Sequence, residues 1–259
     1  MNLALIALLS AVGLFLGMLM LFETGWRIGI DTLKRDREGL AKGGGAVEAA
    51  VFALLGLLLA FTFSGAASRF EARRPLITEE ANAIGTAYLR IDLLPADIQP
   101  EMRQLFRHYL DTRLQTYSNV KDGVATTLKL NESVALQGEI WAKATAACRR
   151  PEAPGYAAML LLPALNAMID ITTTRLAATQ NHPPWIIFLL LAGLCLVSAL
   201  FAGFDNSSNK VRNWLYMVIF AATMSLTLYV ILDLEFPRLG MIRIEAADQT
   251  LIELRKSMQ

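Results

Sequence analysis

The sequence predicts an all-α membrane protein with four transmembrane helices, arranged as two pairs with a helical extramembrane bundle inserted between the second and third spans. The main observation is four uncharged stretches, which cover residues 2–22, 49–68, 183–204 and 213–232. Each is long enough for an α-helix to cross about 30 Å of hydrocarbon. The second observation is the polar segment between the inner two stretches, where helical periodicity recurs and no strand pattern competes.

We therefore expect four parts along the chain. Residues 1–68 form the first transmembrane pair with a basic connecting loop, and residues 69–182 form the bundle. Residues 183–232 form the second pair, and residues 233–259 form a C-terminal tail. The first stretch lacks a positive n-region and a clear cleavage site, so we expect it to be a retained span and not a secretory signal.

Within the first span, Gly13 and Gly17 lie one turn apart. That spacing permits close helix contact in lipid, although glycine is common in such spans. The second span has no turn signal before Leu93 except Pro75, where we expect a kink or a restart. Apolar residues recur beyond this span at heptad-like spacing: Phe70, Ile77, Ala81, Ile84, Tyr88 and Ile91. We interpret them as a stripe that packs on partners.

Three more helices are expected in the bundle. The first begins near Pro100 and ends near Tyr117, where Lys121-Asp122-Gly123 signals a turn. The second begins at Asn131, a plausible N-cap, and ends near Arg150. The third runs from Tyr156, with a kink at Pro163, towards the membrane at residues 182–184.

The distribution of basic residues barely decides the orientation. The two loops within the transmembrane pairs carry seven, namely Arg27, Lys34, Arg35, Arg37, Lys42, Lys210 and Arg212. Flanking the bundle and following the last span are six, namely Arg69, Arg73, Arg74, Arg175, Arg238 and Arg243. Taken literally, the positive-inside rule places the bundle outside the cytoplasm, by a margin of one residue.

Composition and motifs exclude several function classes. A net charge of +1 gives no basic surplus for nucleic acid. Cys148 and Cys195 lack a partner spacing, and His108 and His182 are isolated, so we expect no disulfide, metal or cofactor. No nucleophile with a nearby base and no phosphate loop is found, so an enzyme is poorly supported. The spans contain no ionisable residue, which disfavours proton-coupled transport but leaves a passive pore possible.

Residues 58–74 resemble the second-helix motif of bestrophins. An apolar stretch ending in Phe61 is followed by small residues and then by the charged run of the motif. That run is matched, in order, by Arg69, by Glu71 or its neighbour, by Ala72 and by Arg73. Over nearly the whole chain, through residues 63–95 and 232–240, the sequence resembles a bacterial inner-membrane family of multi-pass proteins labelled bestrophin-like. That label states a relationship and not an activity.

The resemblance implies a homo-oligomeric channel, a pentamer, whose second helices line a hydrophobic neck, with the bundle in the cytoplasm. That side disagrees with the count of basic residues. The resemblance makes Leu57 and Phe61 neck residues, with Ser64 following them. Thr62-Phe63-Ser64 stands where bestrophins carry a polar Arg-x-Asn, which bears on ion selectivity. No calcium-binding acidic cluster is visible, which argues against calcium gating.

Each candidate site has a second interpretation. For Leu57 and Phe61 the alternative is contact with lipid or packing on another helix, which is the more common role of such residues. The charged-ring candidates are Arg69, Arg73, Glu79, Glu80 and Asn82. For the arginines the alternative is contact with lipid headgroups, and for the other three it is a solvated helix face. After the last span, a turn with its own ion pair is expected from Asp233, Glu235, Pro237 and Arg238, and the alternative there is a ligand or cation site.

The leading functional hypothesis is a passive ion channel of the bacterial inner membrane whose partners are further copies of itself, membrane lipids and inorganic ions. The alternative is a non-conducting scaffold or sensor whose bundle binds a partner protein through the stripe from Phe70 to Ile91.

Overall fold

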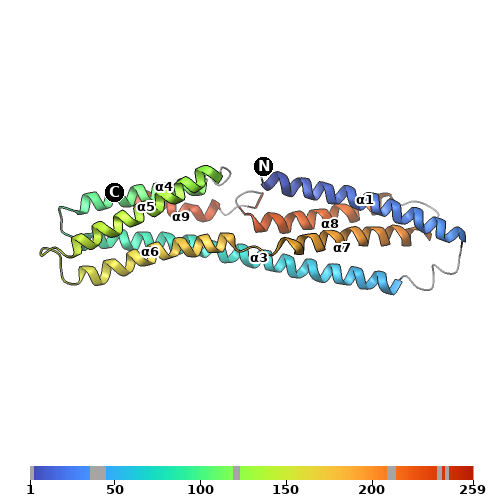
Figure 1. Cartoon of the computed structure of the whole chain (residues 1–259), viewed down its shortest axis with the longest axis horizontal. Helices are drawn as coiled ribbons and strands as arrows, with labels where there is room; N and C mark the ends of the chain where they lie inside the picture. The colour runs from blue at the N-terminus through green and yellow to red at the C-terminus, as the bar shows by residue number, and fades with distance from the viewer. Residues whose placement is uncertain are drawn as a thin grey trace. The chain divides into compact units, whose positions relative to one another are not determined.

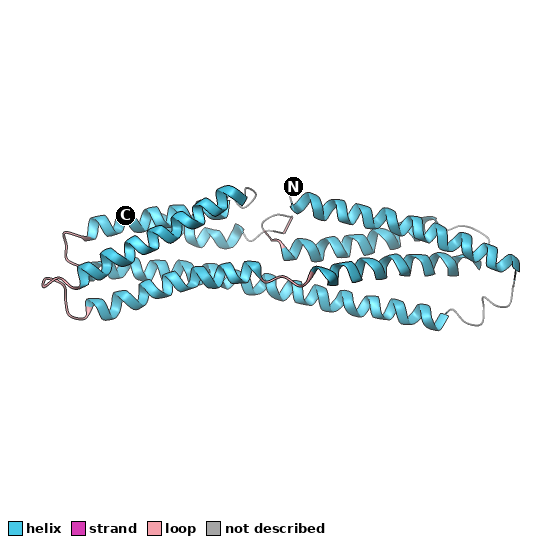
Figure 2. Cartoon of the chain, in the orientation of Figure 1, coloured by secondary structure: helices cyan, strands magenta, loops and turns pink. Residues whose placement is uncertain are grey.

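The computed structural model describes residues 3–35, 45–118, 123–208, 214–237, 241–242 and 245–258. Within those ranges every regular element is a helix, as Figures 1 and 2 show, which confirms the all-α fold class. In chain order the elements are α1 (Leu3–Arg35), α3 (Gly45–Leu89), η1 (Arg90–Leu93), α4 (Gln99–Ser118), α5 (Gly123–Cys148), α6 (Ala157–Gln180), α7 (Trp185–Asp205), η2 (Asn206–Ser208), α8 (Trp214–Glu235) and α9 (Glu245–Ser257).

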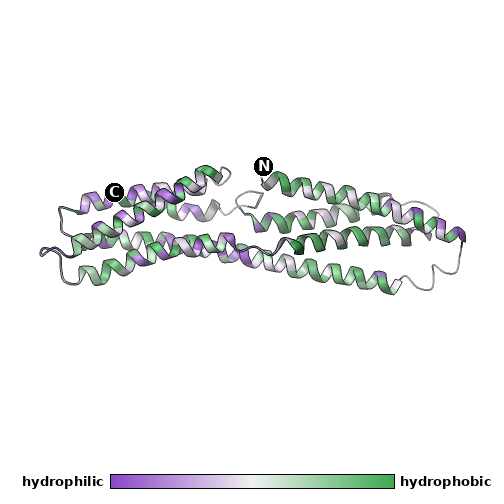
Figure 3. Cartoon of the chain, viewed as in Figure 1, coloured by the Kyte–Doolittle hydropathy of each residue, from purple (hydrophilic) through white to green (hydrophobic). Residues whose placement is uncertain are grey.

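The chain divides into two compact units. The first comprises Met1–Ser68 and His182–Phe236, and the second comprises Arg69–Asn181 and Pro237–Gln259. Four helical stretches of the described chain are long and apolar enough to cross a membrane, and they contain α1, α3, α7 and α8. Figure 3 shows α7 and α8 as almost uniformly hydrophobic, whereas hydrophilic and hydrophobic positions alternate along α4 and α5. The predicted four-span layout is confirmed.

The transmembrane unit is held together by close packing of α1 on α7. A methyl group added at Gly25 would lie 2.0 Å from the carbonyl oxygen of Leu200, and one at Gly203 would lie 2.0 Å from that of Phe22. The two glycines of the predicted pair are packed less closely. Nothing lies within 4 Å of such a methyl at Gly13, and one at Gly17 would lie 3.1 Å from the Leu196 side chain of α7. Small residues do bring two spans together, but they lie further along α1 than we expected.

This shift follows from the length of α1, which continues to Arg35 and does not end near residue 22. The prediction of a loop that begins at Arg27 is therefore wrong for residues 27–35. Charged residues in this stretch pair along the helix, as in Arg27 with Glu23 at 2.7 Å and Lys34 with Asp31 at 3.2 Å. Such pairs support a helix without an apolar face. The other predicted loop residues, Arg37, Lys42, Lys210 and Arg212, lie outside the described residues.

The second unit has its own hydrophobic core. The apolar stripe of α3 and η1 lies inside this core, where Ile77, Ile84 and Ile91 are almost completely buried. Side chains of α4, α5, α6 and α9 complete the core, including Phe106, Ile140, Leu161 and Leu251. The expectation that the stripe packs on partner proteins is therefore wrong, because the chain's own bundle covers it.

Helix boundaries in the second unit differ from expectation at two places. Helix α5 begins at Gly123, so Asn131 lies within the helix and is not its N-cap. Helices α3 and α6 run through Pro75 and Pro163 without a restart. Thirteen residues of the predicted C-terminal tail form α9. This helix packs on α4, where Arg255 donates two hydrogen bonds to the Asp111 carboxylate at 2.7 and 3.0 Å.

Candidate functional site

One face of α3 is exposed at the positions predicted to form the neck. Leu57 is 52% exposed and Phe61 is 66% exposed, and Ser64 is exposed one turn further on. The spacing of four and three residues places all three on one side of the helix. Leu55 and Ala66, which point elsewhere, are buried in the same unit. This helix therefore has one packed side and one uncharged, uncovered side.

The exposed face becomes polar as α3 continues. Ser68, Glu71, Glu79 and Asn82 are exposed at the same three- and four-residue spacing, apart from one longer interval that contains Pro75. Two of the predicted charged-ring candidates, Glu79 and Asn82, thus lie at uncovered positions of the chain. Arg69, a third candidate, is half-buried.

Arg73, another ring candidate, is buried and bound inside the second unit. Its guanidinium donates to the carbonyl oxygens of Ala178 at 3.0 Å and Asn181 at 3.1 Å. These carbonyls lie at the C-terminal end of α6, where backbone acceptors lack a partner within the helix and a cation complements the helix dipole. The side chain serves to cap α6, a role that its sequence position beside two other arginines did not reveal.

Glu80 is completely buried, whereas its neighbour Glu79 is exposed. Arg113 of α4 donates to its carboxylate at 2.7 Å, and Arg175 of α6 forms a second ion pair with it. The Tyr117 hydroxyl donates to the same carboxylate at 3.0 Å. Its ring lies beside both guanidinium groups, with centroid distances of 4.1 Å to Arg175 and 5.0 Å to Arg113.

We call Glu80, Arg113, Tyr117 and Arg175 the buried charge cluster. Because of these contacts, Glu80 faces neither solvent nor a symmetry axis. The two interpretations of the sequence had been a solvated helix face and a charged ring. The three partners come from α4 and α6, and Arg113 lies 33 positions from Glu80 along the chain. No local pattern in the sequence could have joined them, because buried ions are paired by tertiary contacts.

The predicted post-span turn begins later than expected. Asp233 and Glu235 still belong to the last turn of α8 and are buried. The Glu235 carboxylate lies 3.2 Å from Nδ1 of His182, whose ring packs against that of Phe236 with a centroid distance of 4.5 Å. Pro237 follows the helix. Arg238, the remaining residue of this predicted site, lies outside the described residues.

A family comparison places these features in context. The family model described as a Bestrophin-like domain matches residues 33–248. The chain belongs to the bestrophin-like family. Membership confirms the resemblance inferred from the sequence. No curated protein matches the chain.

Two solved structures share the fold of this bestrophin-like chain. Both are of a bacterial bestrophin homologue from Klebsiella pneumoniae that carries a mutation, and both give a TM-score of 0.62. One is 13% identical and covers 93% of this chain and 98% of its own, and the other is 14% identical and covers 96% and 99%. At this identity the likeness concerns the fold.

Proposed function

We propose that this bestrophin-like chain is the subunit of a homo-pentameric ion channel of the bacterial inner membrane, with α3 lining an axial pore. The observation that carries the proposal is the uncovered, uncharged face of α3 at Leu57, Phe61 and Ser64. A single copy with four spans encloses little space, so a pore requires several copies around an axis. Membership of the bestrophin-like family supports this arrangement.

The pore would work by dehydration at an apolar constriction. Rings of Leu57 and Phe61 would form the narrowest part, where an ion loses water without meeting a compensating charge. Further along α3, Glu79 and Asn82 would meet the ion after the constriction. Arg73 and Glu80 are bound within the second unit, so they contribute less to selectivity in this scheme.

The scaffold alternative loses its main support. It depended on the apolar stripe from Phe70 to Ile91 as a surface for another protein, and that stripe is part of the core of the bundle. We therefore place the channel first.

Current through purified protein in a planar bilayer tests the proposal, under asymmetric potassium chloride, with Phe61→Ala and Phe63→Ala alongside. Phe63 is a matched control, because it is also exposed, at 45%, but lies two residues further along α3 and therefore about 200° around the helix axis from Phe61. Phe61→Ala should raise unitary conductance severalfold by removing the aromatic ring from the constriction. Phe63→Ala should conduct like the unmodified chain.

Two results would contradict the proposal at different levels. Equal currents from the unmodified chain and Phe61→Ala would show that Phe61 is not in the neck. Silence from folded oligomers of all three proteins would remove the channel altogether. Where currents are found, the reversal potential gives the charge preference.

A further inference from the structure

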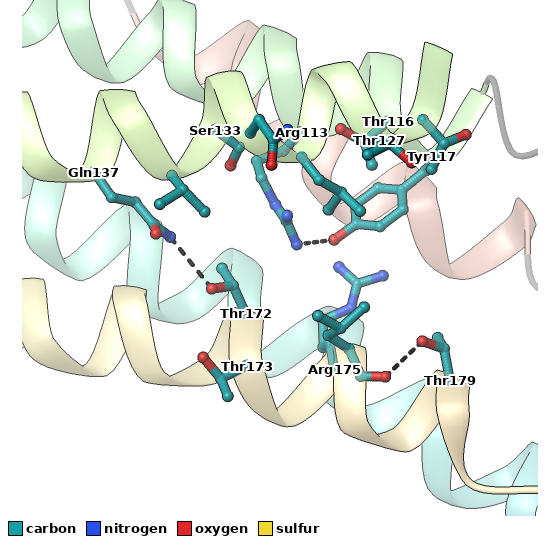
Figure 4. A pocket seen from close by; sticks show the side chains of 15 residues that line it. Arg113, Thr116, Tyr117, Thr127, Ser133, Gln137, Thr172, Thr173, Arg175 and Thr179 are labelled. Carbon is teal, nitrogen blue, oxygen red and sulfur yellow. Dashed lines mark hydrogen bonds between the residues drawn. The ribbon is translucent and has the colours of Figure 1, made fainter. Parts of the chain in front are cut away.

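A groove lies between α5 and α6 of the second unit, beside the buried charge cluster. Its volume is about 430 Å³, within the range of about 300–1,000 Å³ that is typical of small-molecule sites. The residues of its inner side are buried, among them Arg113 and Arg175, and those of its outer side are exposed, among them Val134 and Leu176. Figure 4 shows Arg113 of α4 and Arg175 of α6 pointing towards Tyr117.

Much of the groove surface is apolar. Leu130 and Val134 of α5 and Leu176 of α6 contribute aliphatic side chains. The methyl groups of six threonines and the ring of Tyr117 add further apolar surface. Val134 and Leu176 are left exposed to solvent, so an apolar occupant would remove their side chains from water.

The hydrogen-bond donors of the walls are engaged within the protein. Four of the threonine hydroxyls donate to carbonyls of their own helices: Thr116 to Thr112, Thr127 to Gly123, Thr172 to Ile169 and Thr179 to Leu176. The Gln137 amide donates to the Tyr109 hydroxyl at 3.0 Å, and Arg113 and Arg175 are paired with Glu80. An occupant without hydrogen-bonding groups therefore leaves none of these donors without a partner.

The groove is long and narrow. Its lining on α5 extends from Thr126 to Gln137, which corresponds to about 16 Å along the helix. A volume of about 430 Å³ spread over this length gives a mean width of about 5 Å. A row of methylene groups, about 4 Å across, fits this width, whereas an α-helix of about 10–12 Å does not. At about 30 Å³ for each group of this size, the groove has room for roughly fourteen of them.

One end of the groove lies where the chain connects to the spans. Thr179, a lining residue, is two positions before Asn181, at which the second unit leads towards α7. The Asn181 carbonyl accepts a hydrogen bond from Arg73, four positions after α3 enters this unit at Arg69. Molecules with an alkyl chain concentrate in membranes, because the chain leaves water there. The spans thus keep the groove close to a reservoir of such molecules.

We propose that this groove binds a single-chain amphiphile. Its alkyl chain lies along α5 and α6, and its polar head remains at the exposed outer side. The site is separate from the proposed pore neck, because every residue that lines it belongs to the second unit.

Binding of radiolabelled monoacylglycerols to the full chain tests the proposal, in the steroid detergent CHAPS, which has no linear alkyl chain to compete. These probes have an uncharged head, and their acyl chains range from eight to eighteen carbons. Affinity should rise about fourfold with each added carbon, as expected for a methylene removed from water. It should stop rising near about fourteen carbons, where the groove is full.

A matched pair of substitutions ties binding to the groove. Val134→Trp should weaken binding of monolaurin, the twelve-carbon probe, at least about tenfold, as expected when two methylene groups are displaced. Val124→Trp is the control, because Val124 is the same residue type on the same helix, similarly exposed at 73% against 65%, and does not line the groove. It should bind monolaurin like the unmodified chain, and circular dichroism checks that both variants are folded.

The head group is tested with laurate and dodecyltrimethylammonium, which have the same chain length as monolaurin and opposite charges. Both should bind within about fivefold of monolaurin, because ionic contacts at an exposed site contribute little. Binding of laurate alone would overturn the proposal, since the charge would then decide binding.

Three further results would overturn it. The first is the absence of saturable monolaurin binding. The second is an affinity that keeps rising to eighteen carbons, because that pattern describes partition into micelles. The third is equal monolaurin binding by folded Val134→Trp and Val124→Trp. None of these results depends on whether the protein conducts.

Discussion

At the scale of single residues, Glu79 and Glu80 show how tertiary contacts assign different roles to identical neighbours. Both are glutamates on α3, but only Glu80 points into the bundle, where two arginines and a tyrosine surround it. Removing one partner of a buried ion pair leaves the other charge without compensation and costs about 3–5 kcal/mol. Surface substitutions usually change stability by less than about 0.5 kcal/mol.

Glu80→Gln should therefore destabilise the chain strongly, since it removes the carboxylate that the Arg113 and Arg175 guanidinium groups share. We expect the thermal unfolding midpoint of the solubilised full chain, followed by circular dichroism, to fall by roughly 10 °C. Glu79→Gln is the matched control and should have the same unfolding midpoint as the unmodified chain. Equal midpoints for the two variants would show that the cluster does not stabilise the bundle.

A second residue-scale prediction concerns pH. Hydrogen bonds from Arg150 to the two carboxylate oxygens of Asp97, at 2.7 and 3.0 Å, lower the pKa of Asp97. A carboxyl group whose pKa is lower in the folded state stabilises the fold above its unfolded pKa, about 3.9. That contribution is lost as the pH falls through the lowered folded-state value.

Asp97→Asn should accordingly lower the unfolding midpoint slightly at pH 7, and the difference from the unmodified chain should shrink below about pH 4. Midpoints measured at intervals between these pH values check the expectation. A difference that stays constant across the whole range would mean that the ion pair is not its source.

At the scale of helices, hydrophobic length predicted the spans well and local signals predicted their ends poorly. The four spans and the apolar face of α4 could be predicted because burial in lipid or in a core imposes its pattern on consecutive residues. Charged residues from Arg27 onward suggested a loop, yet α1 continues to Arg35, packs on α7 through Gly25 and carries the ion pair of Glu23 with Arg27. Asn131 suggested an N-cap, a local preference that the α5 helix overrides.

The same limit applies to the glycines. A pair of glycines one turn apart can be found in a sequence, but the partner helix cannot. Gly13 and Gly17 fit the pattern, but Gly13 faces open space and Gly17 faces only the Leu196 side chain, whereas the contacts with backbone involve Gly25 on α1 and Gly203 on α7. Only the register of the two packed helices decides which glycine lies opposite a backbone.

Gly25→Ala should separate α1 from α7, because the new methyl would overlap the backbone oxygen of Leu200, which cannot move aside as a side chain could. Overpacking of this kind costs about 1–3 kcal/mol. The unfolding midpoint of the solubilised chain should fall by several degrees. Gly13→Ala meets open space and improves helix propensity, so it should not lower the midpoint; an equal loss in both variants would contradict a specific clash at Gly25.

At the scale of the whole molecule, α3 contributes residues to both compact units. Its uncharged exposed face belongs to the first, and Arg73, Glu79 and Glu80 belong to the second. In the proposed channel, this face of α3 meets the same face of α3 in other copies. A face in contact with lipid would not meet another copy. Oxidative crosslinking separates these two possibilities.

The experiment uses Ser64→Cys in a chain whose Cys148 and Cys195 are replaced by alanine. A disulfide requires Cα atoms within about 7 Å, which adjacent copies around a narrow axis can provide. Disulfide-linked dimers should therefore form, and a ring of five leaves at least one subunit unpaired, so dimers should reach at most about four fifths of the chains. Phe63→Cys, exposed at the adjacent position of α3, should stay monomeric. Equal crosslinking at both positions, or none at Ser64→Cys in folded protein, would contradict an axis along this face, and complete crosslinking would contradict an odd number of subunits.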